Sequence, residues 1–474
     1  MKGKKALILG LSIVVLLLGA ALFPITANAR IEDSKDVTKF QGSSQYLPDN
    51  AVFSCSSVTE IPEAECDALV ALYTSTNGAS WTDNTDWLVT DTPCSWYGVT
   101  CSGANVYALD LDDNLLSGPI PPQLEDLTSL GVIYLYDNQL TGSIPTELGN
   151  LANLKYLWMW NNQLNGSIPS QLGNLSNLTH LSLSNNQLTG SIPVNLGNLS
   201  SLKELSLDVN QLSGNIPAEL GNLSTLQHMN LLSNQLDGSI PSQLGNLSNL
   251  ESLDLRLNQL SGSIPVELGN LSDLEYLILF NNQLSGTIPT EIGNLTNLNW
   301  LWLQDNQFKG ALPLSLTNLT SISDFKFSLT ELCEPGNQAF QTWLSGISVV
   351  NSTGVRCRST ADFDGSGGTD ISVYRPSNGR WYIEGQGNFK WGLAGDLPVP
   401  GDYDGDGIVD IAIFRPSNGK WYVMGSAPAS WGATGDIPLQ ADYTGDGAAD
   451  KAVLRTSTKR WYIEGIGNTK WYLT

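Results

Sequence analysis

Hydrophobic and polar residues along residues 109–319 follow a pattern that repeats every 24 residues. In one copy Ile133 and Leu135 alternate with Tyr134 and Tyr136, which predicts a short β-strand with one buried face. An asparagine follows the strand, and four residues later comes a glycine that begins Gly-x-Ile/Leu-Pro. A repeat of this length predicts a solenoid in which neighbouring coils share one core. The nine glycines follow one another without insertion or deletion at Gly118, Gly142, Gly166, Gly190, Gly214, Gly238, Gly262, Gly286 and Gly310.

The small and polar residues of each copy predict how a coil turns. The amide of Asn138 can pair with backbone groups of its own turn and of the next coil, so the equivalent asparagines are expected to form a ladder. Gly142 allows a tight bend and Pro145 fixes its own φ, which favours an extended or short 3₁₀ back over a long helix. We therefore expect a β-rich, right-handed solenoid over residues 109–321.

The repeated Leu-x-Gly-x-Ile-Pro sequence resembles the plant-specific class of leucine-rich repeats, found in receptor-kinase ectodomains and polygalacturonase-inhibiting proteins. The resemblance covers all nine copies and implies the leucine-rich-repeat fold. Residues 55–108 resemble the N-terminal cap of that class through Cys94-x-Trp96-x-Gly98-Val99-x-Cys101, and a short helix is expected from Glu63 onward. Trp96 is expected to cover the open end of the leucine core, rather than to contact a ligand.

Six cysteines flank the repeats, and none lies within them. The four at the N-terminal cap allow three connectivities, of which nearness favours Cys55–Cys66 and Cys94–Cys101. Cys333–Cys357 would close a C-terminal cap at residues 322–358. The absence of Cys-x-x-Cys spacing argues against a zinc site.

The N-terminus has the features of a secretory signal peptide. Lys2, Lys4 and Lys5 precede an apolar run over residues 6–23, and Ala27-Asn28-Ala29 forms a cleavage site. Residues 1–29 are therefore predicted to be removed, and residues 30–54 to form a flexible lead-in. This indicates a secreted or extracellular cell-surface protein, attached to a membrane only if the segment stays as an uncleaved anchor.

The residues that alternate with the buried leucines should face outward on the concave sheet, where partners dock in such solenoids. Aromatic residues occupy these positions in two groups, separated by small or polar residues. Exposed aromatic groups favour a binding surface for a protein, peptide or glycan, although cross-strand stacking alone would also explain them. The predicted ligand-binding residues are Tyr134, Tyr136, Tyr156, Trp158, Trp160, Tyr276, Phe280, Trp300 and Trp302.

After Cys357 a new period of 40 residues begins, in which oxygen-bearing side chains stand at positions 1, 3, 5 and 9 of a loop. This spacing suits Ca²⁺, whereas the missing acid at position 12 and the strand that follows exclude an EF-hand. The alternative is turn chemistry alone. The predicted metal ligands are Asp362, Asp364, Ser366 and Asp370, then Asp402, Asp404, Asp406 and Asp410, and finally Asp442, Thr444, Asp446 and Asp450.

These units resemble the FG-GAP/VCBS repeats of integrin-like β-propellers. The resemblance implies a small all-β, propeller-like domain over residues 359–474 with Ca²⁺ in a structural role. Three units are fewer than the four or more blades of a standard propeller.

Composition narrows the function. With 46 acidic and 23 basic residues, the net charge of −23 argues against nucleic-acid binding. No nucleophile–histidine–acid set or phosphate loop is present, so we do not expect an enzyme; a glycan-active enzyme using Glu204 and Asp208 is the least favoured reading. The sequence predicts a recognition or adhesion protein, and the resemblance offers inhibition of a secreted cell-wall hydrolase as an alternative.

Overall fold

The computed structural model describes residues 53–357, 361–365, 369–404, 406–444, 448–464 and 467–469. The predicted signal peptide and nearly all of the lead-in lie outside the described residues, as do Ser366 and Asp446 among the predicted metal ligands. In the described part of the chain, no helix is both long and apolar enough to cross a bilayer.

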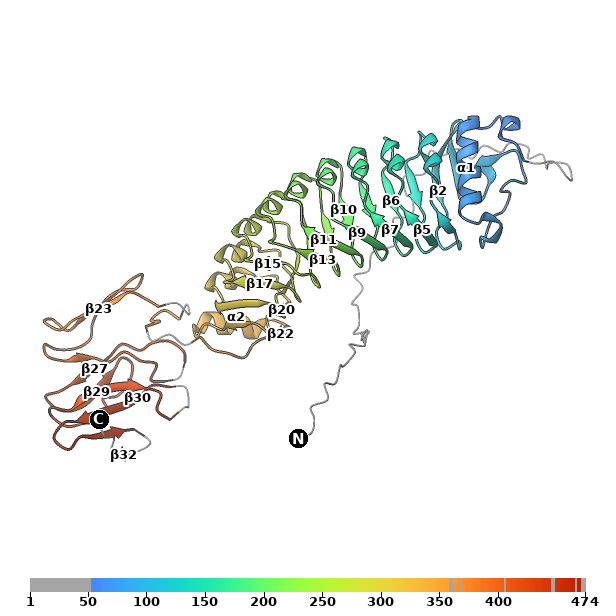
Figure 1. The fold of residues 1–474 in the computed structure, drawn as a ribbon. Helices are drawn as coiled ribbons and strands as arrows, with labels where there is room; N and C mark the ends of the chain where they lie inside the picture. The colour runs from blue at the N-terminus through green and yellow to red at the C-terminus, as the bar shows by residue number, and fades with distance from the viewer. Residues whose placement is uncertain are drawn as a thin grey trace, which may run out of the picture. The chain divides into compact units, whose positions relative to one another are not determined.

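The repeats form a stack of coils whose first strands make one long sheet (Figure 1). Equivalent residues of neighbouring repeats pair with each other, so Ile133 lies beside Leu157 and Leu157 beside Leu181. All three are fully buried, because their faces of the strands point into the stack. The sheet begins with the antiparallel pair β1–β2 and continues with parallel strands. Its strands are β1 (Val99–Ser102), β2 (Asn105–Asp110), β4 (Val132–Tyr134), β6 (Tyr156–Trp158), β8 (His180–Ser182), β10 (Glu204–Ser206), β12 (His228–Asn230), β14 (Ser252–Asp254), β16 (Tyr276–Ile278), β18 (Trp300–Trp302), β20 (Asp324–Lys326) and β22 (Val349–Asn351).

The back of each coil is a short 3₁₀ helix, as expected from the Gly-x-Ile-Pro sequence. These turns stack closely, and a Cβ on Gly149 would lie 2.4 Å from the carbonyl oxygen of Gln171 in the next coil. Glycine is therefore required there for the coils to approach each other. The 3₁₀ helices are η5 (Pro122–Asp126), η6 (Thr146–Asn150), η7 (Ser170–Asn174), η8 (Val194–Asn198), η9 (Ala218–Asn222), η10 (Ser242–Asn246), η11 (Val266–Asn270), η12 (Thr290–Asn294) and η13 (Leu314–Asn318).

A second row of parallel strands, which the sequence pattern did not predict, runs along the flank of the coils. Most flank strands lie in the Gln-Leu-x-Gly part of their repeat, and Gly142 within β5 has a φ of 76°. The row forms two sheets. Its strands are β3 (Ser117–Pro119), β5 (Gln139–Ser143), β7 (Gln163–Ser167), β9 (Gln187–Gly190), β11 (Gln211–Asn215) and β13 (Gln235–Asp237), then β15 (Ser261–Gly262), β17 (Gln283–Gly286), β19 (Gln307–Ala311) and β21 (Glu331–Cys333).

The predicted asparagine ladder joins neighbouring coils. Asn162 accepts a hydrogen bond from the backbone N–H of Leu140 (2.9 Å) in the preceding coil. Its Nδ2 donates to the carbonyl oxygens of Leu135 (2.9 Å) and Met159 (3.2 Å). Because each asparagine satisfies backbone groups of two coils, the ladder keeps the turn after every strand in the same conformation.

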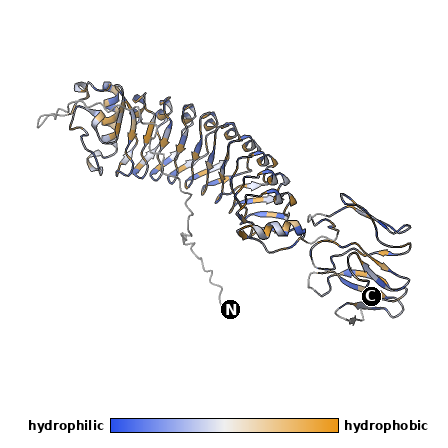
Figure 2. Cartoon of the chain, turned by 180° about the vertical axis from the view of Figure 1, so that it is seen from behind, coloured by the Kyte–Doolittle hydropathy of each residue, from blue (hydrophilic) through white to orange (hydrophobic). Residues whose placement is uncertain are grey.

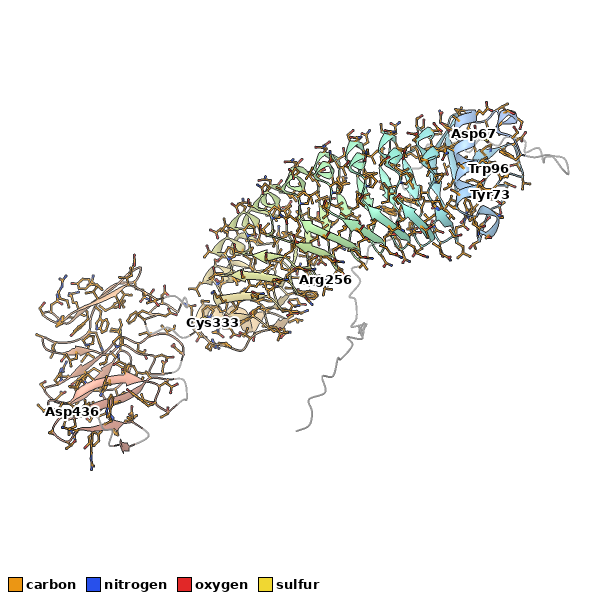
Figure 3. All side chains as sticks on the ribbon, in the orientation of Figure 1. Asp67, Tyr73, Trp96, Arg256, Cys333 and Asp436 are labelled. Carbon is orange, nitrogen blue, oxygen red and sulfur yellow. A yellow bond between two sulfur atoms is a disulfide. The ribbon has the colours of Figure 1, made fainter. Side chains whose placement is uncertain are left out.

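A cap covers each end of the stack (Figure 1). At the N-terminal end, α1 (Glu63–Ser75) packs with three tryptophans, and Trp96 is 1% exposed, as expected of a core cover. Trp96 and Tyr73 lie together in this cap (Figure 3). Short 3₁₀ turns complete it: η2 (Cys55–Ser57), η3 (Gly78–Ser80) and η4 (Pro93–Ser95).

At the other end, α2 (Gln338–Gly346) begins at Asn337, whose side chain accepts hydrogen bonds from two backbone N–H groups of its first turn. Trp343 donates to the carbonyl oxygen of Leu319 in the last coil (3.2 Å). The disulfides are Cys55–Cys66, Cys94–Cys101 and Cys333–Cys357, the pairs expected from the sequence. The C-terminal cap also extends the long sheet by two strands, β20 and β22, beyond the nine predicted copies.

The C-terminal residues form three small antiparallel sheets, one for each 40-residue unit. Hydrophobic residues concentrate in their strands, as they do in the coils of the stack (Figure 2). The sheets contain β23 (Ser372–Arg375), β24 (Arg380–Ile383) and β25 (Gly387–Lys390); β26 (Leu397–Pro398), β27 (Ala412–Arg415) and β28 (Lys420–Val423); and β29 (Ile437–Ala441), β30 (Asp450–Arg455), β31 (Arg460–Ile463) and β32 (Gly467–Thr469).

Candidate functional site

The first aromatic patch, Tyr134, Tyr136, Tyr156, Trp158 and Trp160 together with His180, consists of stacked pairs from neighbouring strands. The parallel register places Tyr134 beside Trp158. Ring centroids are 4.6 Å apart for Tyr134–Trp158, 4.4 Å for Tyr136–Trp160 and 4.9 Å for Tyr156–His180, and each pair is close to parallel. The structure therefore brings together all five residues predicted for this region of the concave face.

The members of the first patch differ in exposure. Tyr134 is buried beneath its neighbours, and this burial is the main cause of the raised pKa of its hydroxyl group. Tyr134 therefore contributes little accessible surface, because Tyr136 and Trp158 pack against it, and its role in ligand binding stays a prediction. Tyr136, Tyr156, Trp158 and Trp160 remain half-buried and provide the accessible part of the patch.

His180 also belongs to this patch, to which the sequence analysis did not assign it. Burial lowers its pKa to about 4, so the imidazole is neutral at physiological pH. Its position 24 residues after Tyr156, on the outward face of the next strand, was the signal that would have identified it.

The second aromatic patch contains Tyr276, Phe280, Trp300 and Trp302. The Trp300 and Trp302 rings stack with centroids 4.9 Å apart and planes 5° apart. The Nζ of Lys326 lies 3.6 Å from the centroid of the Trp302 ring, a cation–π contact that leaves Trp302 8% exposed. The accessible rings are therefore Tyr276, Phe280 and Trp300, and the sequence did not predict the coverage of Trp302 by Lys326.

Carboxyl groups lie between the two patches on the same face. Glu204 accepts a hydrogen bond from the hydroxyl of Ser206 (3.2 Å), and Asp208 accepts one from the hydroxyl of Ser184. Burial raises the pKa of both carboxyl groups. This region therefore has few freely hydrated charges.

Asp254 is the most deeply buried of these acids. Arg256, labelled on the row of coils in Figure 3, places its Nε 3.1 Å from the Asp254 carboxylate. Burial nevertheless raises the pKa of Asp254 to about 7, since loss of hydration outweighs the attraction to the guanidinium. The middle of the concave face is thus acidic, with Arg256 as a partial counter-charge.

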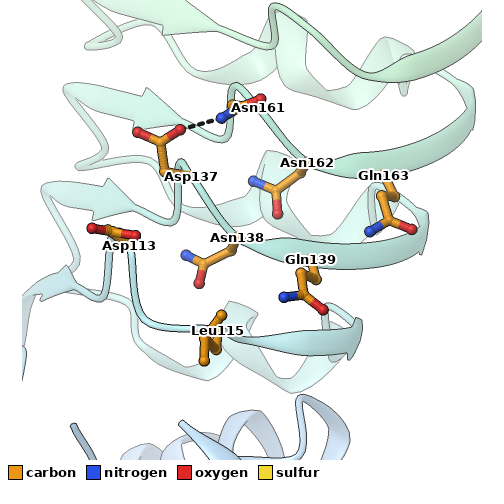
Figure 4. Close-up of a pocket in the computed structure, with 8 residues that line it drawn as sticks. All are labelled: Asp113, Leu115, Asp137, Asn138, Gln139, Asn161, Asn162 and Gln163. Carbon is orange, nitrogen blue, oxygen red and sulfur yellow. Dashed lines mark hydrogen bonds between the residues drawn. The ribbon is translucent and has the colours of Figure 1, made fainter. Parts of the chain in front are cut away.

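A shallow hollow of about 530 Å³ lies where the chain turns after the first concave strands (Figure 4). The amide of Asn161 donates to the carboxylate of Asp137 across this turn, while Asn138 and Asn162 are engaged in the ladder described above. Four of the polar side chains that line the hollow are therefore already hydrogen-bonded within the solenoid, and we assign no separate site to it.

The second C-terminal loop brings three of its predicted metal ligands together. Asp402, Asp404 and Asp410 each offer a carboxylate oxygen, and these oxygens lie within 4.8 Å of one another. Burial, with contributions from the neighbouring acids, raises the pKa of Asp410 to about 6. The side chain of Asp406 instead accepts from the backbone N–H of Ile408 (2.8 Å). A hard divalent cation would relieve the repulsion among these groups, and all-oxygen ligands suit Ca²⁺.

The other two loops repeat parts of this arrangement. In the first loop, carboxylate oxygens of Asp362, Asp364 and Asp370 also lie within 4.8 Å of one another. In the third loop, the backbone N–H groups of Tyr443 (2.7 Å) and Thr444 (2.8 Å) donate to Asp450. Such contacts show that turn chemistry is present as well, so the carboxylates have a structural use even without an ion.

The chain matches three families described in terms of leucine-rich repeats. Residues 62–102 match the leucine rich repeat N-terminal domain, residues 114–264 the leucine-rich repeat region, and residues 273–295 the leucine rich repeat. These matches agree with the cap and the coils. The resemblance of the C-terminal units to FG-GAP/VCBS repeats, and their propeller-like character, remain predictions.

Solved structures similar to this chain include plant receptor ectodomains. The leucine-rich-repeat ectodomain of the membrane receptor kinase GASSHO1/SCHENGEN3 from Arabidopsis thaliana, in complex with CASPARIAN STRIP INTEGRITY FACTOR 2, is 38% identical with a TM-score of 0.50, covering 57% of this chain and 35% of that one. The Arabidopsis receptor kinase HAESA, in complex with the peptide hormone IDA and the co-receptor SERK1, is 36% identical with a TM-score of 0.46, covering 56% and 50%. The chain thus spans between a third and a half of the length of these ectodomains.

The matched region is similar to a leucine-rich-repeat ectodomain, which agrees with the prediction that the chain is not an enzyme. The disulfides and the likeness to ectodomains fit an extracellular or cell-surface location. The N-terminal cap and the coils are thus similar to leucine-rich repeat families and resemble the leucine-rich-repeat ectodomain of a plant receptor kinase.

Proposed function

We propose that this protein is an extracellular recognition protein that binds an extended peptide, or an extended segment of a protein, along the concave face of its repeats. The observation that carries the proposal is the pair of stacked aromatic patches on one continuous sheet. Rigid, half-buried aromatic rings offer contact area at little cost in side-chain entropy. The likeness to an ectodomain found in complex with CASPARIAN STRIP INTEGRITY FACTOR 2 supports the same role.

The spacing of the patches sets the length of the ligand. Six strand-to-strand steps separate β6 from β18 in the sheet order. At about 4.8 Å per step the patches are about 29 Å apart along the sheet. An extended peptide covers about 3.3–3.6 Å per residue, so about eight or nine residues would reach from one patch to the other.

The charge between the patches sets the character of the middle of the ligand. Glu204, Asp208 and Asp254 lie there with Arg256 as their neighbouring cation, and the whole chain has a net charge of −23. A lysine or arginine in the ligand would supply the positive charge that these acids lack. The proposed ligand therefore has an aromatic or apolar anchor near each end and a basic residue between them.

In this proposal the C-terminal module is a separate unit that calcium stabilises. The proposal rests on the carboxylate groups of Asp402, Asp404 and Asp410 and of the matching first loop. Its role would be structural, because the ion would hold together loops whose acids otherwise repel one another.

Binding can be tested with a library of twelve-residue peptides displayed against the purified, immobilised chain. Selected peptides should carry two aromatic or apolar anchors about eight residues apart with a basic residue between them. Trp160→Ala and Trp300→Ala should each weaken binding of a selected peptide about tenfold or more, as expected for central aromatic contacts. Gln171→Ala, on the exposed back of a coil, is the matched control.

A glycan array run on the same protein tests whether the ligand is a carbohydrate instead of a peptide. Selective glycan binding that is lost in Trp160→Ala, with no peptide selected, would replace the peptide by a carbohydrate. Binding of either class that is unaffected by both tryptophan substitutions would show that the concave face is not the recognition surface.

A further inference from the structure

Successive sheets of the C-terminal module bury one another through a repeated junction. At the first junction, Ile411 and Ile413 of the second sheet pack with Phe363 and Trp381 of the first unit. At the second, Val453 of the third sheet packs in the cluster that contains Trp421. We call the side that contains Ile411 and Ile413 the incoming face, and the side that contains Phe363 and Trp381 the outgoing face; residues 40 positions away in the other units are equivalent.

Polar contacts fix the same geometry at both junctions. Trp391 donates its indole N–H to the carbonyl oxygen of Tyr422 (3.1 Å), and Trp431 does the same to Tyr462 (3.3 Å). The backbone N–H of Val409 donates to the carbonyl oxygen of Asp362 at the first junction (2.6 Å). The junction is therefore a specific interface that this sequence forms twice within the chain.

The incoming face of the first sheet has the same apolar character but is open to solvent. Ile371 is 69% exposed and Val373 is 56% exposed, whereas their equivalents Ile411 and Ile413 are 8% and 1% exposed. In the part of the chain that the structure describes, β23 pairs only with β24 and lies at the edge of its sheet. An exposed valine in an edge strand, with an exposed isoleucine directly before that strand, favours association.

The outgoing face of the third unit is open in the complementary way. Tyr443 is 37% exposed, while its equivalent Phe363 at the first junction is 7% exposed. Trp461 is only half-buried, although Trp381 and Trp421 are buried by the sheet that follows each of them. Tyr443 and Trp461 contact each other edge to face, with centroids 6.4 Å apart, so they form one surface.

We propose that the C-terminal modules of two copies of this chain associate head to tail, the incoming face of one copy (Ile371, Val373) docking on the outgoing face of the other (Tyr443, Trp461). A second copy is the occupant because the chain already forms this junction twice at equivalent positions, with Ile413 and Val453 where Val373 stands, although Lys451 replaces Ile411 at the second junction. The contact is heterologous, joining two different surfaces, so it either closes into a ring or continues as a chain of copies. Association through this module would present several concave faces at once, which raises the avidity for a multivalent partner.

The test measures the mass of the purified full chain by sedimentation velocity over a range of concentrations, in buffer containing Ca²⁺. Wild type should form dimers or larger assemblies. Val373→Glu places a charge on the incoming face and Tyr443→Glu places one on the outgoing face, and each should weaken association more than about tenfold. Val355→Glu, at an exposed valine outside both faces, should leave association unchanged.

Mixing the two variants provides the sharper readout. Each variant keeps one intact face, so an equimolar mixture should form a dimer and nothing larger. Circular dichroism confirms that each variant is folded, and Val373→Ser serves if Val373→Glu is not. A monomeric wild type at every concentration, association that survives both substitutions, or a mixture of folded variants that stays monomeric would each overturn the proposal.

Discussion

The indole ring of Trp160 lies parallel to the phenol ring of Tyr136, with centroids 4.4 Å apart and planes 10° apart. The two rings belong to neighbouring coils, so this contact both joins the coils and builds the accessible surface of the first aromatic patch. Stacking that rigidifies the sheet and a platform that binds a ligand are therefore compatible roles of the same residues. A rigid platform loses little entropy when a ligand docks on it.

The stabilising part of this contact can be separated from its binding part. A double-mutant cycle of Tyr136→Ala and Trp160→Ala should show a coupling free energy of about 0.5–1.5 kcal/mol in denaturant unfolding, because parallel-displaced rings attract each other. The reference cycle pairs Trp160→Ala with Trp300→Ala, which lie in different patches and should be additive. A coupling near zero for Tyr136 and Trp160 would show that the rings do not hold the coils together.

Substitution of a ladder asparagine should destabilise the repeats strongly. Asn186 accepts from the backbone N–H of Leu164 (3.0 Å) and donates to the carbonyl oxygens of Met159 (3.0 Å) and Leu183 (3.1 Å). Asn186→Ala leaves these buried backbone groups without partners, so the free energy of unfolding should fall by about 2 kcal/mol or more. Asn195→Ala, on the exposed back of the same repeat, should change it by less than about 0.5 kcal/mol. Equal effects of the two substitutions on chemical denaturation would contradict a stabilising ladder.

The regular part of the fold could be predicted because each repeat carries the same buried, turn and ladder residues at the same positions. The burial of Ile133 and Leu135 follows from their alternation, and the ladder follows from an amide placed after each strand. The flank strands could not be predicted in this way. A segment such as Gln139–Ser143 contains a glycine at a φ of 76° and lacks a long alternating pattern, so its pairing depends on the neighbouring coils.

The sequence predicted which residues lie on the concave face, but not which of their rings are accessible to a ligand. Tyr134 and Tyr136 both occupy outward positions of one repeat, yet only Tyr134 is buried, because ring packing between coils decides which of them is covered. The contact of Lys326 with Trp302 depends on the conformation of a long side chain. The periodicity of the sequence reveals neither the burial of Tyr134 nor the contact of Lys326 with Trp302.

One turn position in each repeat offers a route to a more stable protein. Val209 has a φ of 52°, a conformation that is unfavourable for a β-branched side chain, and it is exposed. Asn161 and Asn185 occupy the equivalent positions of earlier repeats and hydrogen-bond to each other. Val209→Asn should therefore raise the free energy of unfolding by about 1 kcal/mol. The control is Val194→Asn, at an exposed valine outside the positive-φ positions, and a loss of stability in Val209→Asn alone would refute the strain at this turn.

Removal of calcium should destabilise the C-terminal module and leave the repeats unchanged. In a thermal melt, EGTA should lower the midpoint temperature of this module's unfolding transition by several degrees. The carboxylates of Asp402, Asp404 and Asp410 lie close together and repel one another once the ion is removed. Asp404→Asn should reduce the stabilisation by Ca²⁺ while stabilising the calcium-free protein, since it removes one of the repelling charges. Asp305→Asn removes the same charge from an exposed turn of the repeats and should do neither. Melts that are indifferent to both EGTA and Asp404→Asn would leave these acids as turn residues only.

The buried carboxyl group of Asp254 should make the stability of the repeats depend on pH. Burial raises its pKa from 3.8 to about 7 in the folded protein, so between these values the folded state binds more protons than the unfolded state. The free energy of unfolding should therefore fall as the pH rises from about 4 to about 7, and the contribution of this group is of the order of 3 kcal/mol. The ion pair with Arg256 limits the loss at neutral pH, because the ionised carboxylate keeps a partner at 3.1 Å.

Comparison with Asp254→Asn isolates this group from the other carboxylates. The difference in the free energy of unfolding between the variant and wild type, measured by urea denaturation at pH 4.5, 6.0 and 7.5, should shift in favour of the variant as the pH rises. Asp237→Asn, at the exposed end of flank strand β13, should give a difference that does not change in this range. If the Asp254→Asn difference is also constant with pH, the carboxylate is already ionised at pH 4.5 and Arg256, rather than burial, sets its protonation.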